Sequence, residues 1–144
     1  MKRRLLLAAV VLGLAGLGYA WYILSATYDD TSNVKADFNV EATAFIQEFV
    51  KDRAAANEKY MEKIISVAGI ADDISSPNDS LVTIRFSDSG SGSYAIFSFQ
   101  ENNMEAAKKV QQGEKVTIKG SCSGGNYSEI LDLTSIEFKR CIIE

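Results

Sequence analysis

The feature that most constrains this chain is an uncharged, apolar stretch of 20 residues near its N-terminal end, Leu5 to Leu24. A helix of that length, at about 1.5 Å per residue, crosses the roughly 30 Å of hydrocarbon in a bilayer. A basic cluster at residues 2–4 precedes the stretch and an acidic pair at residues 29–30 follows it. Because positive charge stays on the cytoplasmic side, we expect residues 1–26 to form a single-pass membrane anchor. The N-terminus would be cytoplasmic and the remaining chain extracytoplasmic, in the periplasm.

A cleaved secretory signal is the alternative reading of the same segment. Gly18-Tyr19-Ala20 has the small-x-small pattern of a cleavage site. Trp21 directly after it, and an apolar run that continues through Leu24, favour the anchor instead. No cysteine near the end of the run could carry a lipid. Both readings place the rest of the chain in the same compartment.

The charge of the exported part limits its partners. The first 26 residues hold three of the 15 Lys and Arg and none of the 19 Asp and Glu, which leaves the remainder at a net charge of −7. Such a domain repels nucleic acid unless a local basic patch reverses the field. Histidine is absent, and with it the commonest general base and metal ligand. The sequence therefore predicts no enzyme activity, no cofactor and no metal.

Hydrophobic periodicity divides the remaining residues. Residues 27–37 are polar and read as a tether, and residues 38–144 as one domain. From Phe38 the apolar residues recur at helical steps of three and four, and Ala54 to Ala56 prolong the pattern. We therefore expect one leading amphipathic helix that ends between Asn57 and Met61.

Five strands are expected after that helix. A first strand, interrupted by Gly69, is followed by two strands, then a helix ended by Gly113, then two more strands; the fifth should bulge near Thr134 or Ser135. The predicted strands are 63–74, 81–87, 94–99, 115–122 and 129–138, and the predicted helix is 101–112. Five strands with a helix between the third and fourth are typical of the OB fold, a five-stranded Greek-key barrel. The fold class is thus mostly β (α+β).

Two segments support this interpretation by resemblance. NEKYMEKIISVAGI at residues 57–70 and GEKVTIKGSCSG at residues 113–124 resemble motifs of the tRNA-anticodon-binding-like OB-fold family, and the likeness covers residues 38–138. The resemblance implies an OB barrel in an exported or membrane-attached bacterial protein, and it implies little about substrate. This chain departs from the family pattern at Ile136, the position at which many relatives have a second cysteine. The resemblance therefore does not imply a disulfide for this chain.

The two cysteines, Cys122 and Cys141, are not expected to form a disulfide. A hairpin centred near Asn126 would set Cys122 opposite Ile130 and leave Cys141 several residues away. The Cα atoms of a disulfide must lie within about 7 Å. We expect Cys122 to be a buried apolar residue and Cys141 to be a thiol near the C-terminus.

An OB barrel usually binds its ligand along strands two and three. Candidate ligand-binding side chains on that surface are Thr83, Arg85, Tyr94, Ile96 or Phe97, and Tyr127. The alternative is that the aromatic residues simply fill the barrel, since strands are rich in them anyway. Arg85 is the only positive residue between Lys63 and Lys108, which argues against a nucleic-acid groove.

Other polar groups have simpler readings. Lys108, Lys109, Lys115 and Lys119 form a modest basic cluster that reads as solvated surface, and the acidic residues at 72, 73 and 79 lack the spacing of a calcium loop. The function expected from the sequence is a membrane-anchored, non-catalytic binding or scaffolding module for another envelope protein. The alternative is a binder of single-stranded nucleic acid or oligosaccharide, and a weaker one is an enzyme with a carboxylate pair brought together by folding.

Overall fold

The computed structural model describes Gly16 and residues 31–78, 80–100 and 103–144. The predicted membrane helix, and the tether before residue 31, lie outside the described residues apart from Gly16. Within the described part, no helix is both long and apolar enough to cross a membrane.

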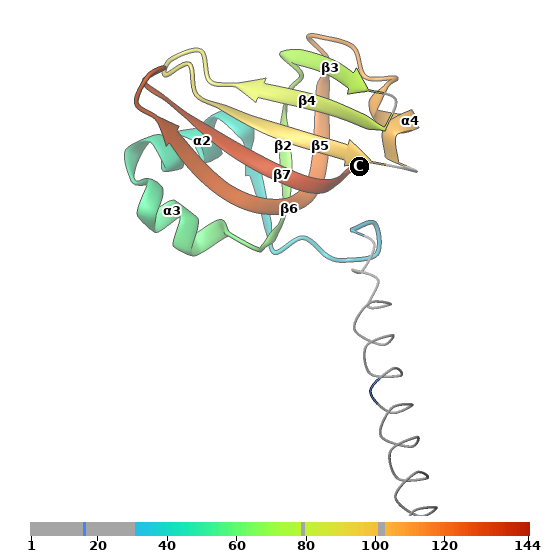
Figure 1. Cartoon of the computed structure of the whole chain (residues 1–144), viewed down its shortest axis with the longest axis horizontal. Helices are drawn as coiled ribbons and strands as arrows, with labels where there is room; N and C mark the ends of the chain where they lie inside the picture. Colours follow the sequence, from blue (N-terminus) through green and yellow to red (C-terminus); the bar gives the residue numbers. More distant parts are fainter. Residues whose placement is uncertain (1–15, 17–30, 79, 101–102) are drawn as a thin grey trace, which may run out of the picture.

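The described residues form a single mixed sheet with short helices (Figure 1). The strands are β1 (Phe38–Glu41), β2 (Ile64–Ile70), β3 (Asp73–Asn78), β4 (Leu81–Ser87), β5 (Tyr94–Gln100), β6 (Lys115–Ser128) and β7 (Leu133–Ile143). The helices are α2 (Ala42–Lys51), α3 (Arg53–Tyr60) and α4 (Met104–Ala107). The strand order is β1-β2-β6-β7-β5-β4-β3, with β1/β2 and β5/β7 parallel and every other pair antiparallel. This mostly β, α+β arrangement agrees with an OB-like fold.

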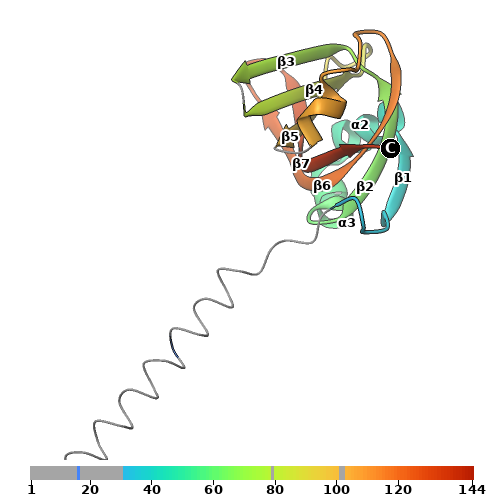
Figure 2. The ribbon, with the colours of Figure 1, turned by 90° about the vertical axis from the view of Figure 1, so that its right-hand side faces the viewer.

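The sheet has seven strands in the described residues, not the predicted five, and its pairing ends at β1 and β3 instead of closing. One extra strand arises because the predicted strand 63–74 divides in two. Ala71 donates its N–H to Glu114 O beside β6, whereas Asp72 donates to Arg85 O of β4. Consecutive residues thus bond to opposite sides of the domain. Figure 2 shows β1 and β2 together at one side and β3 with β4 at the other.

The predicted leading helix is also divided. Its first residues form β1, which pairs with β2, and a break at Asp52 separates α2 from α3. Asp52 has φ −151° and ψ 89°, and its side chain accepts a hydrogen bond from Ala55 N–H at 3.1 Å. It is the N-cap of α3, a role for which aspartate is well suited. The apolar spacing predicts the helical region within 42–60, but it does not predict the cap inside that region.

The β6–β7 hairpin turns later than predicted. The glycines at 124 and 125, read as a loop, lie inside β6, and the turn is formed by Glu129–Asp132. A Cβ on Gly125 would lie 2.5 Å from Phe49 Cδ1, so this glycine lets α2 approach the strand. The pairing irregularities fall between Lys119 and Ser121 and between Cys122 and Gly124, not at residues 134–135.

Both cysteines are free and fully buried. Cys122 is buried as predicted, but it lies opposite Phe138 and not near Ile130, because the hairpin turns further along the chain. Cys141 lies beside Gly120, where an added Cβ would come within 2.7 Å of its Sγ. Burial raises the pKa of the Cys122 thiol to about 11, and it raises the pKa of the Cys141 thiol still further, so neither is a nucleophile at neutral pH.

The core receives buried side chains from β2, β4, β5, β6 and β7 and from α2 and α3. Alternate residues of β4 and β5 point inward, as the sequence predicts for β4. Aromatic rings fill much of the core: the centre of the Phe97 ring lies 4.8 Å from that of Phe86 and 4.7 Å from that of Phe138, on which it stacks. Phe45 and Phe49 of α2 contact Tyr60 of α3. The predicted helix 101–112 is described only as α4, followed by turns and by Gly113 at φ 87°.

Candidate functional site

The outward face of β4 and β5 is the expected OB ligand surface, and we call Thr83, Arg85 and Tyr94 the polar face. All three are half-buried, because the alternate residues of the same strands point into the core. Ser87 of β4 pairs with Tyr94 of β5, which places Arg85 two residues along the strand from that pair. The guanidinium of Arg85 lies 5.5 Å from the centre of the Tyr94 ring, so the structure does bring these two predicted residues together.

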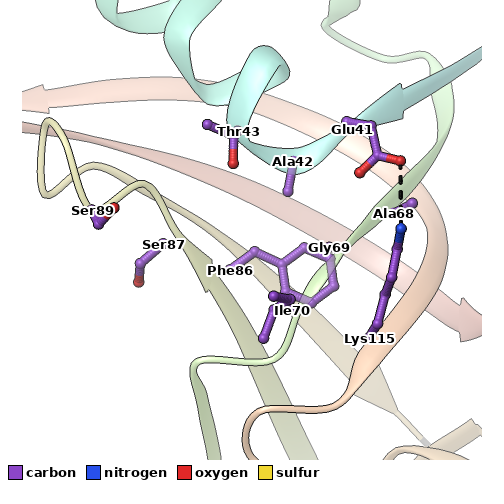
Figure 3. A pocket seen from close by; sticks show the side chains of 10 residues that line it. All are labelled: Glu41, Ala42, Thr43, Ala68, Gly69, Ile70, Phe86, Ser87, Ser89 and Lys115. Atoms are coloured by element: carbon purple, nitrogen blue, oxygen red, sulfur yellow. Dashed lines mark ion pairs between the residues drawn. The ribbon is translucent and has the colours of Figure 1, made fainter.

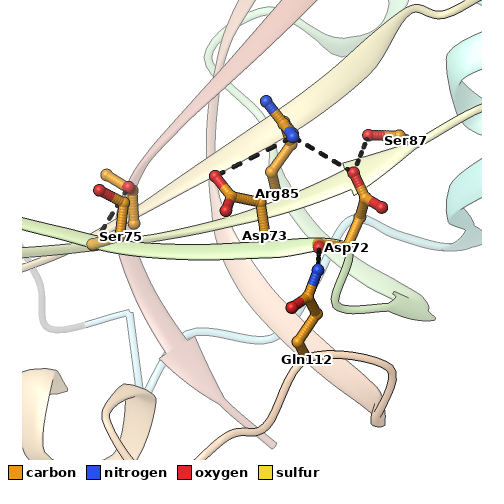
Figure 4. A network of polar contacts seen from close by, with 7 residues as sticks. Asp72, Asp73, Ser75, Arg85, Ser87 and Gln112 are labelled. Carbon is orange, nitrogen blue, oxygen red and sulfur yellow. Dashed lines mark hydrogen bonds and ion pairs between the residues drawn. The ribbon is translucent and has the colours of Figure 1, made fainter.

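The charge of Arg85 is already compensated within the domain (Figure 4). Its Nη2 lies 3.3 Å from Asp72 Oδ2 and 4.0 Å from Asp73 Oδ2. Ser87 Oγ donates to the same Asp72 oxygen at 2.7 Å, and Gln112 Nε2 donates to Asp72 O at 2.7 Å. The Nε of Arg85 is buried without a hydrogen bond among the described residues. The acidic pair that the sequence presented as ordinary turn residues therefore neutralises the one cation of the polar face.

Phe97 does not belong to this face, which corrects the prediction. Its ring is fully buried and contacts Phe86 and Phe138. In β5 it has the same parity as the buried Ala95 and Phe99, and successive strand residues point to opposite sides. Ile96, the other choice at this place, is the residue that faces outward.

Tyr127 lies on the other side of the sheet from the polar face. It pairs with the buried Thr134 of β7, whereas Tyr94 pairs with the next residue, Ser135. Directly opposed residues share a face and consecutive residues do not. The Tyr127 ring instead lies 5.7 Å from the guanidinium of Arg53, at the start of α3. The five predicted site residues therefore do not form one site.

A pocket of about 340 Å³ lies where β1 meets α2 (Figure 3). Phe86 and Ile70 form part of its wall, and Ser87 and Ser89 contribute hydroxyl groups. Lys115 stands at its rim, 3.9 Å from Glu41, and the side chains of both are well exposed. The pocket is open and its one cation is paired, so nothing within it selects a ligand class.

The turn between β6 and β7 is a surface that the sequence reasoning missed. Ile130 is 95% exposed and Leu131 65% exposed. The sequence pattern predicts a strand over residues 129–138, in which alternate residues would be buried. Residues 129–132 contain no Gly, Asn or Pro, so Asp132 is the one residue among them that is typical of a turn.

Among the described residues, no cluster of three His, Cys, Asp or Glu side chains lies close enough to hold a metal ion. Asp72 and Asp73 are engaged with Arg85, and Asp79 lies outside the described part.

The fold and these surfaces define a small α+β domain of OB-like architecture. The family model tRNA_anti-like matches residues 1–132, and the chain belongs to that family. No curated protein matches the chain.

Two solved structures are similar in fold. A "putative nucleic acid-binding lipoprotein" from Klebsiella pneumoniae subsp. pneumoniae is 19% identical, with a TM-score of 0.56 over 83% of this chain and 99% of that one. The asparaginyl-tRNA synthetase of Entamoeba histolytica, in complex with asparaginyl-adenylate, is 21% identical over 57% of this chain and 21% of its own, with a TM-score of 0.42. The first likeness supports the OB-like fold alone.

Proposed function

We propose that this protein is a membrane-anchored, non-catalytic binding or scaffolding module whose partner is another protein of the cell envelope. The N-terminal helix would hold the domain outside the cytoplasm. Family membership and the OB-like fold support a binding role. The location rests on the apolar segment and its flanking charges.

The observation that carries this proposal is the state of Arg85. An OB surface that binds a polyanion combines stacking aromatic rings with a basic groove. Here Arg85 has two carboxylates within 4.0 Å, Phe97 is buried, and Tyr127 lies on the other side of the sheet. Exposed ion pairs contribute only about 0–1 kcal/mol, yet the two carboxylates would still repel an approaching phosphate.

The basic cluster predicted from the sequence does not replace that groove. Lys108 pairs with Glu105 at 3.0 Å and Lys115 with Glu41 at 3.9 Å. The side chain of Lys119 is only 9% exposed, and its Nζ lies 3.2 Å from Glu144 Oε1. Three of its four lysines are therefore compensated by carboxylates.

The alternative is a binder of single-stranded nucleic acid or oligosaccharide. The name of the Klebsiella lipoprotein favours nucleic acid. The stacking of Arg85 on Tyr94 is the local feature that such a ligand could use.

Fluorescence anisotropy with labelled single-stranded DNA and RNA tests the proposal. In about 150 mM salt, where screening acts beyond about 8 Å, we expect no binding in the micromolar range. Micromolar or tighter binding would replace the proposed function with the alternative. A pull-down from detergent-solubilised membranes with the full-length chain should recover a defined envelope protein in a stoichiometric complex.

A further inference from the structure

The turn Glu129–Asp132, which we call the hairpin tip, presents aliphatic side chains where the fold does not require them. Turns are usually filled by Gly, Asn, Asp and Ser, which fit or hydrogen-bond the turn backbone. Ile130 and Leu131 instead stand 95% and 65% exposed. We propose that the hairpin tip docks into an apolar cleft of the envelope partner, and that basic residues border this cleft. The inference rests on the proposed function and names the surface that carries it out.

The backbone of the hairpin tip is held in place by its own side chains. Tyr127 Oη donates to Asp132 Oδ1 at 2.5 Å, and Leu131 N–H donates to Ser128 Oγ at 3.3 Å. Asp132 has φ 51°, a left-handed conformation that aspartate tolerates better than most residues. A surface already fixed in one conformation loses less entropy on binding.

The base of the hairpin is fixed to α3. Asn57 Oδ1 accepts from Gly125 N–H at 2.8 Å, and Asn57 Nδ2 donates to Gly125 O at 3.2 Å. A buried Phe49 ring occupies the space beside Gly125. Hydrogen bonds and packing therefore hold the hairpin against the helices, and Figure 1 shows its turn end beside α2 and α3.

A Tyr–Arg pair extends the same surface toward α3. Tyr127 is 45% exposed, is bonded to Asp132 of the tip, and lies against Arg53 at 5.7 Å. Tyrosine and arginine are among the residues that dominate binding energy at protein interfaces. The proposed docking surface therefore combines the aliphatic side chains of the tip with the neighbouring Tyr127–Arg53 pair.

Charge decides among the possible occupants of this surface. Glu129 and Asp132 flank the aliphatic pair, and both are exposed. These carboxylates disfavour insertion into an anionic lipid surface. In a symmetric dimer of two tips they would face each other. Basic residues around an apolar cleft in a different protein complement them.

Site-specific photocrosslinking in cells tests the inference with the full-length chain. Benzoylphenylalanine replaces Ile130 or Leu131 at the tip, Ile96 on the β4–β5 face, or Ile70 as the matched control. Ile70 is also aliphatic and 60% exposed, but it lies at the end of β2. We expect one protein adduct, identified by mass spectrometry, from positions 130 and 131 and none from position 70. The purified partner should then bind the wild-type protein. Its affinity should be at least tenfold lower for the double variant Ile130→Ser with Leu131→Ser, and unchanged for Ile70→Ser.

The other outcomes separate this inference from the proposed function. Adducts from position 96 without any from the tip, or unchanged affinity of the double variant, overturn the docking surface and leave the binding module intact. A self-adduct, or adducts with lipid alone, overturn the stated partner. Absence of protein adducts from every position overturns both proposals. Circular dichroism of the double variant confirms that any loss of binding does not come from unfolding.

Discussion

The polar face and the hairpin tip differ in what their side chains already contact. Arg85 on the polar face forms ion pairs with two carboxylates and lies over the ring of Tyr94. At the hairpin tip the backbone is bonded internally, while Ile130 and Leu131 are left to the solvent. The polar face, where the fold class predicts ligand binding, therefore has its charge paired within the domain. The exposed aliphatic side chains lie instead at the hairpin tip. Fold analogy indicates where binding is common; the contacts indicate where binding energy is still available.

The largest expected effect tests whether the aromatic content of β5 belongs to the core. Phe97→Ala should lower the free energy of unfolding by about 3–5 kcal/mol, because it removes a buried ring and leaves a cavity. Urea denaturation followed by circular dichroism measures it. Ile96→Ala, one residue away and facing outward, should cost clearly less. Equal losses at the two positions would contradict the assignment of Phe97 to the core.

The next effect concerns how firmly the hairpin is mounted. Gly125→Ala places a Cβ 2.5 Å from Phe49 Cδ1, so overpacking should cost about 1–3 kcal/mol of unfolding free energy. Gly90→Ala is the matched control, since its nearest contact would be 3.6 Å away. If Gly125→Ala were as stable as wild type, the hairpin could move away from α2 and would not be preorganised.

The neutralisation of Arg85 can be reversed without removing it. The double variant Asp72→Asn with Asp73→Asn removes two negative charges beside the guanidinium. Each charge repels a phosphate 4 Å away by about 1 kcal/mol in water. The two contributions sum to about 2 kcal/mol, so the affinity for single-stranded DNA, measured by anisotropy at low salt, should rise roughly 30-fold over the wild type. Adding Arg85→Gln should abolish the gain. An unchanged affinity in the double variant would mean that the carboxylates are not what excludes a polyanion.

Acid should act on the turn beside the polar face. The Ser91 hydroxyl, donating to Asp88 at 2.7 Å, holds the pKa of the Asp88 carboxyl below its ordinary value. A lowered folded-state pKa means that the contribution of Asp88 to stability is present above the unfolded pKa, about 3.9, and is lost as pH falls through the lower folded value. The difference in unfolding free energy between wild type and Asp88→Asn should therefore shrink as the pH falls below about 3.9. A difference independent of pH would refute this role.

The smallest expected effect is at the hairpin tip. Ile130→Ser and Leu131→Ser should change the unfolding free energy by no more than about 0.5 kcal/mol each, because exposed side chains contribute little. Thermal melts of both variants measure this. A loss above 1 kcal/mol would show that the tip is part of the fold and not a surface kept for a partner.

Regular patterns in the sequence predicted regular structure well. Val82, Ile84 and Phe86 alternate with polar residues, and all three are buried as that alternation requires. The order of a leading helical region, strands, a short helix and two final strands was also recognisable. Local periodicity is read from neighbouring residues, so a single sequence contains it.

What was missed depended on distant contacts. Nothing near Phe38 shows that residues 38–41 will pair with β2, because the partner lies more than 20 residues away. Gly125 reads as a loop residue until Phe49 is seen to occupy the space where its side chain would be. The neutralisation of Arg85 by Asp72 and Asp73 depends on the pairing of β3 with β4. The misplacement of Tyr127 and the missed neutralisation of Arg85 follow from such long-range contacts, whereas the misplacement of Phe97 is an error of strand parity within β5.

Gly120 of β6 and Cys141 of β7 compete for the same space, since a Cβ added at position 120 would lie 2.7 Å from Cys141 Sγ. Their sizes are therefore coupled: a methyl group at position 120 should be less costly when position 141 lacks the sulfur, with Lys139 O at 3.3 Å as the remaining close contact. The two positions behave as one packing unit whose volume is divided between β6 and β7. Substitutions there should be made as exchanges, with growth at one position matched by shrinkage at the other.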